Sequence, residues 1–302
     1  MEAVSQMKAT DIMTILFPTI SVFVPLLEPK REEITKARKT FKYGATDRHQ
    51  LDVYTPSDTS KKHPLLFWVY GGGFVTGERT LAAPIDLAYG NIGVYFAARG
   101  FVTIVPDYRL TPGATYPGAA EDLRDALAWT VSHPDELGPT ADTASAYFLA
   151  HSAGGVHALT LLLEPSVLSA APKLRAHIKG AIIASAPSHF EPVGHDVGPR
   201  DATSMYYGSP EATMAHAPLT LFRALPDEAV KSLPPLALIE CERDPEWFKV
   251  VIGDFHKALV ERGMKAPLIL AQGHNHISFS YAISTGQGEG WAEEVVAWIK
   301  SL

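Results

Sequence analysis

Short continuous runs of apolar residues recur along this chain, separated by longer segments in which apolar residues return every three or four positions. Six such runs span residues 65–70, 101–105, 146–150, 181–184, 236–240 and 268–270. A strand that is buried on both faces is typically a continuous apolar run, whereas a strand with one wet face alternates. The runs therefore predict an α/β fold with a mostly parallel central sheet and helices on both faces.

Helical spacing is clearest in three of the intervening segments, which are residues 121–131, 154–163 and 291–302. Near the start, two short strand-like stretches at 41–43 and 51–54 flank a turn-rich segment at 44–48. This arrangement predicts an antiparallel hairpin that precedes the parallel strands.

Two segments depart from this alternation of strand-like and helical patterns. Residues 12–27 are apolar but contain Pro18 and Pro25, so we expect a stretch too short and too broken for a spanning helix. Acidic residues precede it and no small-residue cleavage site follows, which disfavours a secretory signal. Residues 185–230 are rich in Pro, Gly, His and Tyr and predict an insertion over the sheet edge, where function often lies.

Composition narrows the function classes. The chain has 302 residues, 46% hydrophobic and 20% charged, which fits one large α/β domain over residues 1–302. A net charge of −7 gives no footprint for nucleic acid. Cys241 is the single cysteine, so no intrachain disulfide and no thiolate metal cluster is expected, and a reducing, cytoplasmic location is the default.

A serine stands at a predicted strand-to-helix turn. The run 146–150 leads directly into residues 151–155 (HSAGG) and then into a helical pattern. A nucleophile elbow has this context, because small residues two before and two after the serine let strand and helix approach closely. Here Ala150 occupies the first small position, and Ser152 is the candidate nucleophile. The alternative is a glycine-rich turn without chemistry.

Residues 70–74 (YGGGF) follow the strand predicted at 65–69. Acyl transfer needs backbone N–H donors where the carbonyl oxygen becomes an oxyanion, and such a loop supplies them beside the N–H after the nucleophile. We therefore expect Gly72, Gly73 and Ala153 to form an oxyanion hole. A dinucleotide-binding loop is excluded because the third glycine of G-x-G-x-x-G is missing at position 76.

An acid and a base follow in the chain order of α/β-hydrolases, Ser…Asp…His. Residues 240–245 follow a strand and offer Glu240, Glu242 and Asp244 as acids, between which the pattern itself does not choose. Residues 273–278 hold His274 and His276 after the last strand. The H-x-H pair could instead bind a metal, but no third ligand stands nearby in the sequence, so we expect no metal.

Together these motifs resemble the α/β-hydrolase superfamily, specifically hormone-sensitive-lipase-like carboxylesterases and the related kynurenine formamidase-like hydrolases. The shared stretches are Y-G-G-G-F at 70–74, P-D-Y-R-L-T-P at 106–112, Y-P-G-A-A-E-D at 116–122, H-S-A-G-G at 151–155, E-R-D-P at 242–245 and G-H-N-H-I-S at 273–278. The resemblance implies an α/β-hydrolase fold with Asp244 as the acid and His276 as the base. It also implies a helical cap made of an N-terminal segment, residues 1–38, and the 185–230 insertion.

The resemblance implies a serine hydrolase that cleaves a small, fairly apolar carboxylic ester without a cofactor. An aryl formamidase, a lactonase and a non-catalytic ligand-binding relative remain as alternatives, as do a homodimer and contact of residues 12–27 with a membrane surface. Two positions depart from the family pattern: Tyr70 stands where histidine is usual, and Ala150 replaces the elbow glycine. In the segment 106–122, Asp107 and Arg109 are expected to brace the fold rather than to take part in catalysis.

Overall fold

The protein forms one eight-stranded sheet, described here from a computed structural model in which residues 1–194, 196, 198 and 200–302 are placed. The strands are β1 (Lys39–Lys42), β2 (Gln50–Tyr54), β3 (His63–Val69), β4 (Val102–Pro106), β5 (Ala141–His151), β6 (Ile178–Ala184), β7 (Leu236–Cys241) and β8 (Leu268–Ala271). Their order across the sheet is β1-β2-β4-β3-β5-β6-β7-β8. β2 is antiparallel to β1 and β4, and the remaining pairs are parallel. The predicted hairpin and parallel sheet are thus confirmed.

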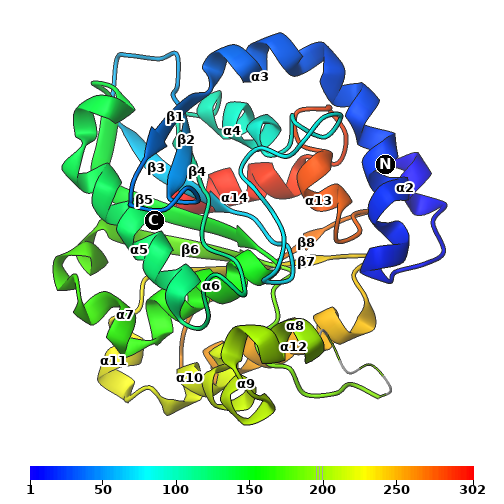
Figure 1. The fold of residues 1–302 in the computed structure, drawn as a ribbon, viewed down its shortest axis with the longest axis vertical. Coiled ribbons are helices and arrows are strands. Elements are labelled where there is room, and N and C mark those ends of the chain that lie inside the picture. Colours follow the sequence, from blue (N-terminus) through cyan, green and yellow to red (C-terminus); the bar gives the residue numbers. More distant parts are fainter. Residues whose placement is uncertain (195, 197, 199) are drawn as a thin grey trace.

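Helices cover both faces of the sheet, with α4 and α14 on one face and α5 and α6 on the other (Figure 1). The helices that follow or join the strands are α4 (Gly90–Ala97), α5 (Gly118–Ser132), α6 (Ala153–Leu163), α7 (Pro165–Ser169), α12 (Glu246–Glu261), α13 (Ser278–Tyr281) and α14 (Gly290–Lys300), with short 3-10 turns at Pro134–Leu137 and Pro172–His177. The core between the layers is apolar, and the central strands stack Phe67 on Phe148 with ring centroids 4.8 Å apart. Because parallel strands align their ends, the loops that follow β3, β5, β6, β7 and β8 meet at one edge of the sheet.

The N-terminal segment is helical throughout most of its length. It comprises α1 (Glu2–Ser5), α2 (Ile12–Leu27), a 3-10 turn (Glu28–Lys30) and α3 (Arg31–Ala37). The break that we expected at Pro18 and Pro25 is therefore wrong, since α2 runs through both prolines. Both prolines are exposed, so the carbonyls that lose a helical N–H partner four residues earlier can face water instead. By length and composition alone, the helical stretch 12–37 could cross a membrane, a property that core helices and signal sequences share.

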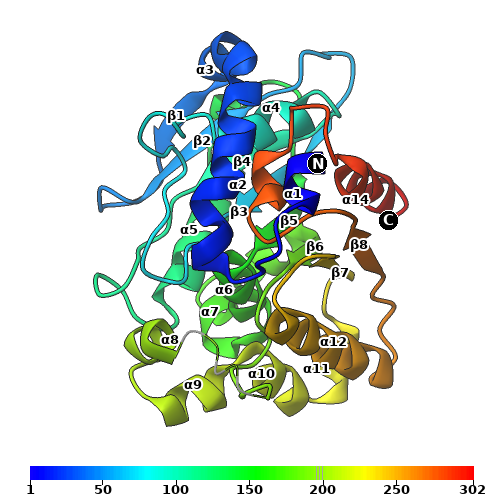
Figure 2. The same cartoon turned by 90° about the vertical axis from the view of Figure 1, so that its right-hand side faces the viewer.

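Where the structure describes it, the 185–230 insertion forms four short helices, the last of which ends one residue beyond it: α8 (Arg200–Tyr207), α9 (Pro210–His216), α10 (Pro218–Ala224) and α11 (Asp227–Lys231). In its described part the insertion adds no strand to the sheet, as the sequence predicts. These helices lie together with α12 on one side of the molecule, whereas α2 and α3 lie on another (Figure 2).

Candidate active site

Ser152 occupies the sharp turn between β5 and α6. Its backbone has φ 56° and ψ −129°, a conformation that a residue with a side chain adopts only when the surrounding structure holds it there. The Ser152 N–H donates to the Ala184 carbonyl at 2.9 Å. Gly154 is required at its position because an added Cβ would stand 2.3 Å from the Tyr70 carbonyl oxygen. This is the strained geometry of a nucleophile elbow.

The methyl group of Ala150, where the family pattern has glycine, leaves the sheet undisturbed. Ala150 is fully buried and pairs with Val69 on β3 and Ile183 on β6 in regular register. The elbow that follows keeps its strained serine. The departure at Ala150 is therefore accommodated by the packing around the strand.

A chain of hydrogen bonds links three residues that are far apart in sequence. Ser152 Oγ and His276 Nε2 are 2.9 Å apart, and His276 Nδ1 and Asp244 Oδ1 are 3.0 Å apart. His276 and Asp244 are buried, whereas Ser152 is partly accessible. With the carboxylate accepting from Nδ1–H, Nε2 is the ring nitrogen that can accept the serine proton.

The second oxygen of Asp244 is also held. Ser185 Oγ donates to Oδ2 at 2.5 Å, and the Cys241 N–H donates to the same oxygen at 3.2 Å. Sequence analysis did not identify Ser185 as a site residue. The sequence could have pointed to Ser185 by its position, because it is a polar residue directly after the buried strand β6 at the same sheet edge. These two donors fix the carboxylate that faces His276.

The other two acids of the 240–245 segment have different partners. Glu242 Oε2 accepts from the Gly273 N–H at 2.5 Å, at the start of the loop that carries His276. Glu240 is half-buried at the end of β7, and burial raises the pKa of its carboxyl. The structure therefore places Asp244, and neither glutamate, against the His276 ring.

His274 has a structural environment that differs from that of His276. Its Nε2 contacts the Gly288 carbonyl at 2.6 Å, and its Nδ1 contacts Ser278 Oγ at 3.1 Å. Burial lowers the pKa of His274. With both ring nitrogens paired, His274 fastens its loop to the segment before α14. Among the described residues, no group of three or more His, Cys, Asp or Glu stands together as candidate metal ligands.

The glycine loop at 70–74 lies directly against the serine. A Cβ on Gly71 would stand 2.7 Å from Ser152 Cβ. Within the described residues, the N–H groups of Gly72, Gly73 and Ala153 have no hydrogen-bond acceptor. Unpaired amides beside a nucleophile can donate to an oxygen that becomes negatively charged during reaction.

Tyr70 replaces the usual histidine before these glycines and is fixed by a buried polar network. Its hydroxyl donates to Asp107 Oδ1 at 2.6 Å and accepts from the Arg48 guanidinium at 2.8 Å. Its carbonyl accepts from the Tyr108 hydroxyl at 2.7 Å. Burial raises the pKa of Tyr70 well above its usual range, so the phenol stays a donor. Tyr70 and Asp107 thus brace the loop.

Two further side chains near the site are kept uncharged. The ring of His151 lies 4.6 Å from that of His276, centroid to centroid, and burial together with this neighbour holds the pKa of His151 well below its usual range. Burial raises the pKa of the Cys241 thiol well above its usual range. His151 therefore adds no second positive charge beside the base, and Cys241 is a poor nucleophile.

Aromatic rings join the insertion to the glycine loop. Phe74, the last residue of the loop, stacks on Tyr206 of α8 with centroids 4.8 Å apart. Beneath them, His157 of α6 lies 5.1 Å from the Tyr206 ring, and its Nδ1 is 3.2 Å from the Tyr206 hydroxyl. All three side chains are buried. The insertion is thereby packed onto the same loop that offers the unpaired amides.

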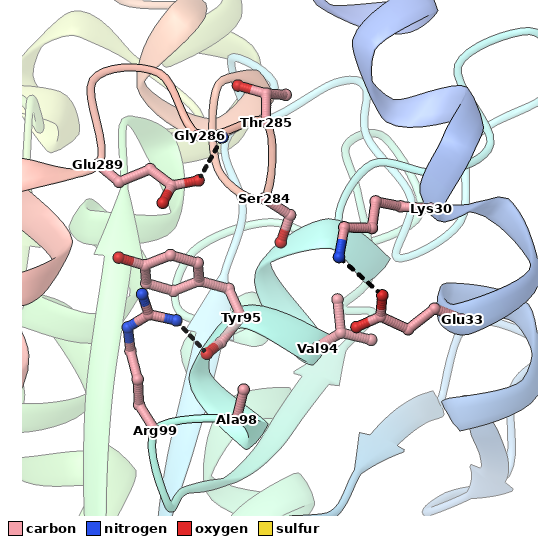
Figure 3. A pocket seen from close by; sticks show the side chains of 10 residues that line it. All are labelled: Lys30, Glu33, Val94, Tyr95, Ala98, Arg99, Ser284, Thr285, Gly286 and Glu289. Carbon is pink, nitrogen blue, oxygen red and sulfur yellow. Dashed lines mark hydrogen bonds and ion pairs between the residues drawn. The ribbon is translucent and has the colours of Figure 1, made fainter.

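A separate cavity of about 390 Å³ lies between α3, α4 and the loop before α14. Figure 3 shows its charged side chains turned toward local partners: Lys30 pairs with Glu33 at 2.9 Å, and Arg99 donates to the Tyr95 carbonyl at 3.0 Å. None of Ser152, Asp244, His276 and the three oxyanion candidates lines it. The cavity therefore does not belong to the chain of hydrogen bonds at the sheet edge.

The sequence of this chain is similar to those of known esterases. The BD-FAE family pattern matches residues 51–247. A probable isoprenylcysteine alpha-carbonyl methylesterase from Oryza sativa subsp. japonica is 25% identical over 246 residues, which cover 78% of this chain and 56% of that protein. The chain thus spans about half the length of the curated relatives that it matches first.

Solved structures share the fold over almost the whole chain. A hyperthermophilic esterase from the archaeon Pyrobaculum calidifontis has a TM-score of 0.71 at 19% identity, covering 99% of this chain and 96% of that one. Esterase B from a Lactobacillus has a TM-score of 0.70 at 15% identity, covering 96% of each chain. At these identities the likeness concerns the fold.

Proposed function

Because the chain belongs to the BD-FAE family, among the carboxylesterases of the α/β-hydrolase fold, we propose that it is a serine hydrolase that cleaves a small, fairly apolar carboxylic ester through an acyl-enzyme. One observation carries the proposal: the strained Ser152 contacts His276, and His276 contacts Asp244, at 2.9 and 3.0 Å. The esterase names of its relatives support the same reaction class.

In the first half-reaction, His276 Nε2 accepts the Ser152 proton as Oγ attacks the acyl carbonyl carbon. Asp244 holds the ring in the tautomer that leaves Nε2 free and stabilises the imidazolium that forms. The carbonyl oxygen gains negative charge beside the N–H groups of Gly72, Gly73 and Ala153. The imidazolium then gives its proton to the departing alcohol oxygen, and the acyl group stays on Ser152.

In the second half-reaction, water attacks the acyl-enzyme and His276 accepts its proton. The same three amides stabilise the second oxyanion, and the proton returns to Ser152 Oγ as the carboxylic acid leaves. This sequence needs no electron transfer and no metal-bound water. The chain's own residues supply the nucleophile, the base and the oxyanion donors.

The proposal is tested by replacing the nucleophile and by labelling it. Ser152→Ala should lower kcat for p-nitrophenyl acetate on the order of 10⁴-fold or more, because triad members act as a unit. A fluorophosphonate should label the wild-type protein on the peptide that contains Ser152. Ser280→Ala, which removes another buried hydroxyl near the same edge, is the matched control and should keep its activity.

A folded Ser152→Ala variant that retains more than a few per cent of wild-type activity would contradict the proposal. Wild-type protein that neither labels nor hydrolyses an ester would instead favour a ligand-binding relative. Parallel assays with p-nitrophenyl esters of increasing chain length, N-formyl-kynurenine and a lactone separate the ester reading from the formamide and lactone alternatives, which the same triad could serve.

A further inference from the structure

The N-terminal segment touches the residue directly before the acid and the residue directly before the base. The Arg243 guanidinium donates to the Met7 carbonyl oxygen. The side-chain amide Nδ2 of Asn275 donates to Thr19 Oγ1 at 2.9 Å. Figure 2 shows why both contacts can form, since α1 and α2 run beside α13 at the carboxyl edge of the sheet. Both loops are thereby attached to one segment, across separations of 236 and 256 positions in the chain.

Asn275 uses its whole side chain in this arrangement. Its Oδ1 accepts from the N–H groups of Ile277 and Ser278 at 3.1 and 2.8 Å, which closes the turn around His276 and caps the start of α13. Its Nδ2 donates to Thr19 Oγ1 at 2.9 Å and makes a longer contact with Met7 Sδ at 3.7 Å. Asn275 is 1% exposed and Thr19 is fully buried. Water therefore cannot replace this bond, and loss of the Thr19 hydroxyl would leave the buried amide with only the weak thioether acceptor of Met7.

The two loops are also joined to each other. The Arg243 N–H donates to the His274 carbonyl at 2.8 Å, and Thr19 Oγ1 donates to Met7 Sδ at 3.4 Å. The contacts among Met7, Thr19, Asn275, His274 and Arg243 therefore form a closed circuit behind the acid and the base. A closed circuit restricts relative movement of the two loops more than either contact would alone.

Apolar packing holds α2 in the position from which Thr19 contacts Asn275. Ile20 and Phe23 on its inner face are buried in a cluster with Tyr281 and Ala282. Thr19 therefore presents its hydroxyl from a helix that is anchored on α13 immediately beyond the His276 loop.

From these contacts we infer that Thr19 and Asn275 are positioning residues, which set the distance and direction of His276 relative to Ser152 and Asp244 through the N-terminal helix. The inference rests on the proposed function, because it concerns the same triad. Neither residue touches the serine. Their effect comes through His276, and a displacement of about 1 Å at such a site can cost on the order of 100-fold in rate.

The test is Thr19→Val, which keeps the branched shape and removes the hydroxyl that accepts from Asn275. We expect kcat for p-nitrophenyl acetate to fall roughly ten- to a hundredfold with KM nearly unchanged. Labelling of Ser152 by a fluorophosphonate should slow in proportion, because it depends on the same base. Thr19→Ser restores the hydroxyl and should return most of kcat.

Ser21→Ala is the matched control, because Ser21 lies on the exposed face of the same helix and its Oγ donates to the Phe17 carbonyl. It should leave kcat and KM unchanged. A folded Thr19→Val variant with wild-type kcat, even at a lower melting temperature, would overturn the inference. So would an equal kcat loss in Thr19→Ser and Thr19→Val.

If Thr19→Val fails to fold, Arg243→Leu decides the question, because it removes the Met7 contact from a half-buried position. A lower kcat at unchanged KM supports the inference, and an unchanged kcat contradicts it. The proposed function has its own readout: wild-type labelling at Ser152 and ester hydrolysis. Wild-type activity together with unaltered variants would contradict the inference and leave the function standing.

Discussion

Two segments outside the central sheet reach its carboxyl edge by different kinds of contact. The N-terminal segment reaches the loops of the acid and the base through hydrogen bonds, such as Thr19 to Asn275. The 185–230 insertion reaches the glycine loop through aromatic packing, such as Tyr206 on Phe74. Hydrogen bonds fix distance and angle, whereas stacked rings bury surface and tolerate small slides.

The two kinds of contact suit two different requirements at the carboxyl edge of the sheet. Groups that transfer a proton must be held within a few tenths of an ångström, and they receive directional contacts. Groups that enclose a substrate must form a pocket of the right shape that excludes water, and the insertion contributes packed aromatic rings there. In each case the supporting contact comes from a segment that is expected from the sequence to cover the sheet edge. The cap function of both segments remains a proposal, and the following predictions test the contrast.

The largest effect is expected at His276, whose loop is held by the hydrogen bonds of the N-terminal segment. His276→Ala should lower kcat on the order of 10⁴-fold or more, because within the described residues His276 Nε2 is the base within hydrogen-bond distance of Ser152 Oγ. His274→Ala should retain much of its kcat and lose thermal stability instead, since it breaks the bond to the Gly288 carbonyl. Steady-state kinetics and thermal melts of both variants check this ranking, and the reverse order would exchange their roles.

The acid comes next. Asp244→Asn should lower kcat roughly 10³- to 10⁴-fold, because an amide facing Nδ1 favours the wrong histidine tautomer. Glu242→Gln is the matched control: it weakens only the bond to the Gly273 N–H and should cost less than tenfold. If Glu242→Gln proved the more damaging of the two, the acid would have to be reassigned.

A smaller and different effect is expected on the aromatic side. Tyr206→Ala removes the ring that packs on Phe74, so the cavity should lower stability by about 3–5 kcal/mol and raise KM more for long acyl esters than for acetate. Tyr206→Phe keeps the ring and loses only the contact with His157, so its KM should stay near wild type. If Tyr206→Ala lowered kcat at unchanged KM, the insertion would be acting on the chemistry, and the contrast between the two segments would collapse.

The smallest effect concerns acid stability beneath the insertion. Burial lowers the pKa of His157 to about 3, while in the unfolded chain the group titrates near its ordinary value of about 6.5. The unfolded state therefore binds more protons between these values, so the stability is complete above pH ~6.5 and is lost as pH falls through this window. The slope is at most about 1.4 kcal/mol per pH unit.

His157→Phe should accordingly flatten the dependence of the free energy of unfolding on pH between about 6 and 4. His133→Gln, at an exposed position after α5, should leave the slope unchanged. Urea melts at several pH values measure both. An unaltered slope in His157→Phe would mean that acid lability arises elsewhere, including at His151, whose pKa burial also lowers.

Elements whose signals are local could be predicted from the order of residues alone. Apolar runs predicted the strands of the sheet, and the strand-to-helix turn made Ser152 the candidate nucleophile, because neighbouring residues carry both patterns. The order of motifs along the chain narrowed the base to His274 or His276. The choice of Asp244 among three nearby acids came from resemblance to a family, since a short acidic segment contains no directional information.

The residues that support Ser152, Asp244 and His276 become apparent only from contacts in the folded chain. Ser185 meets Asp244 across 59 positions of chain and Asn275 meets Thr19 across 256, and no local period encodes such pairs. The continuity of α2 was likewise missed, because proline is generally disfavoured inside a helix. Only the fold shows that Thr14 and Ser21, whose carbonyls lose a helical partner to Pro18 and Pro25, are exposed to water. Local propensity depends on neighbours in sequence, whereas burial and hydrogen-bond partners depend on neighbours in space, and the latter exist only once the chain has folded.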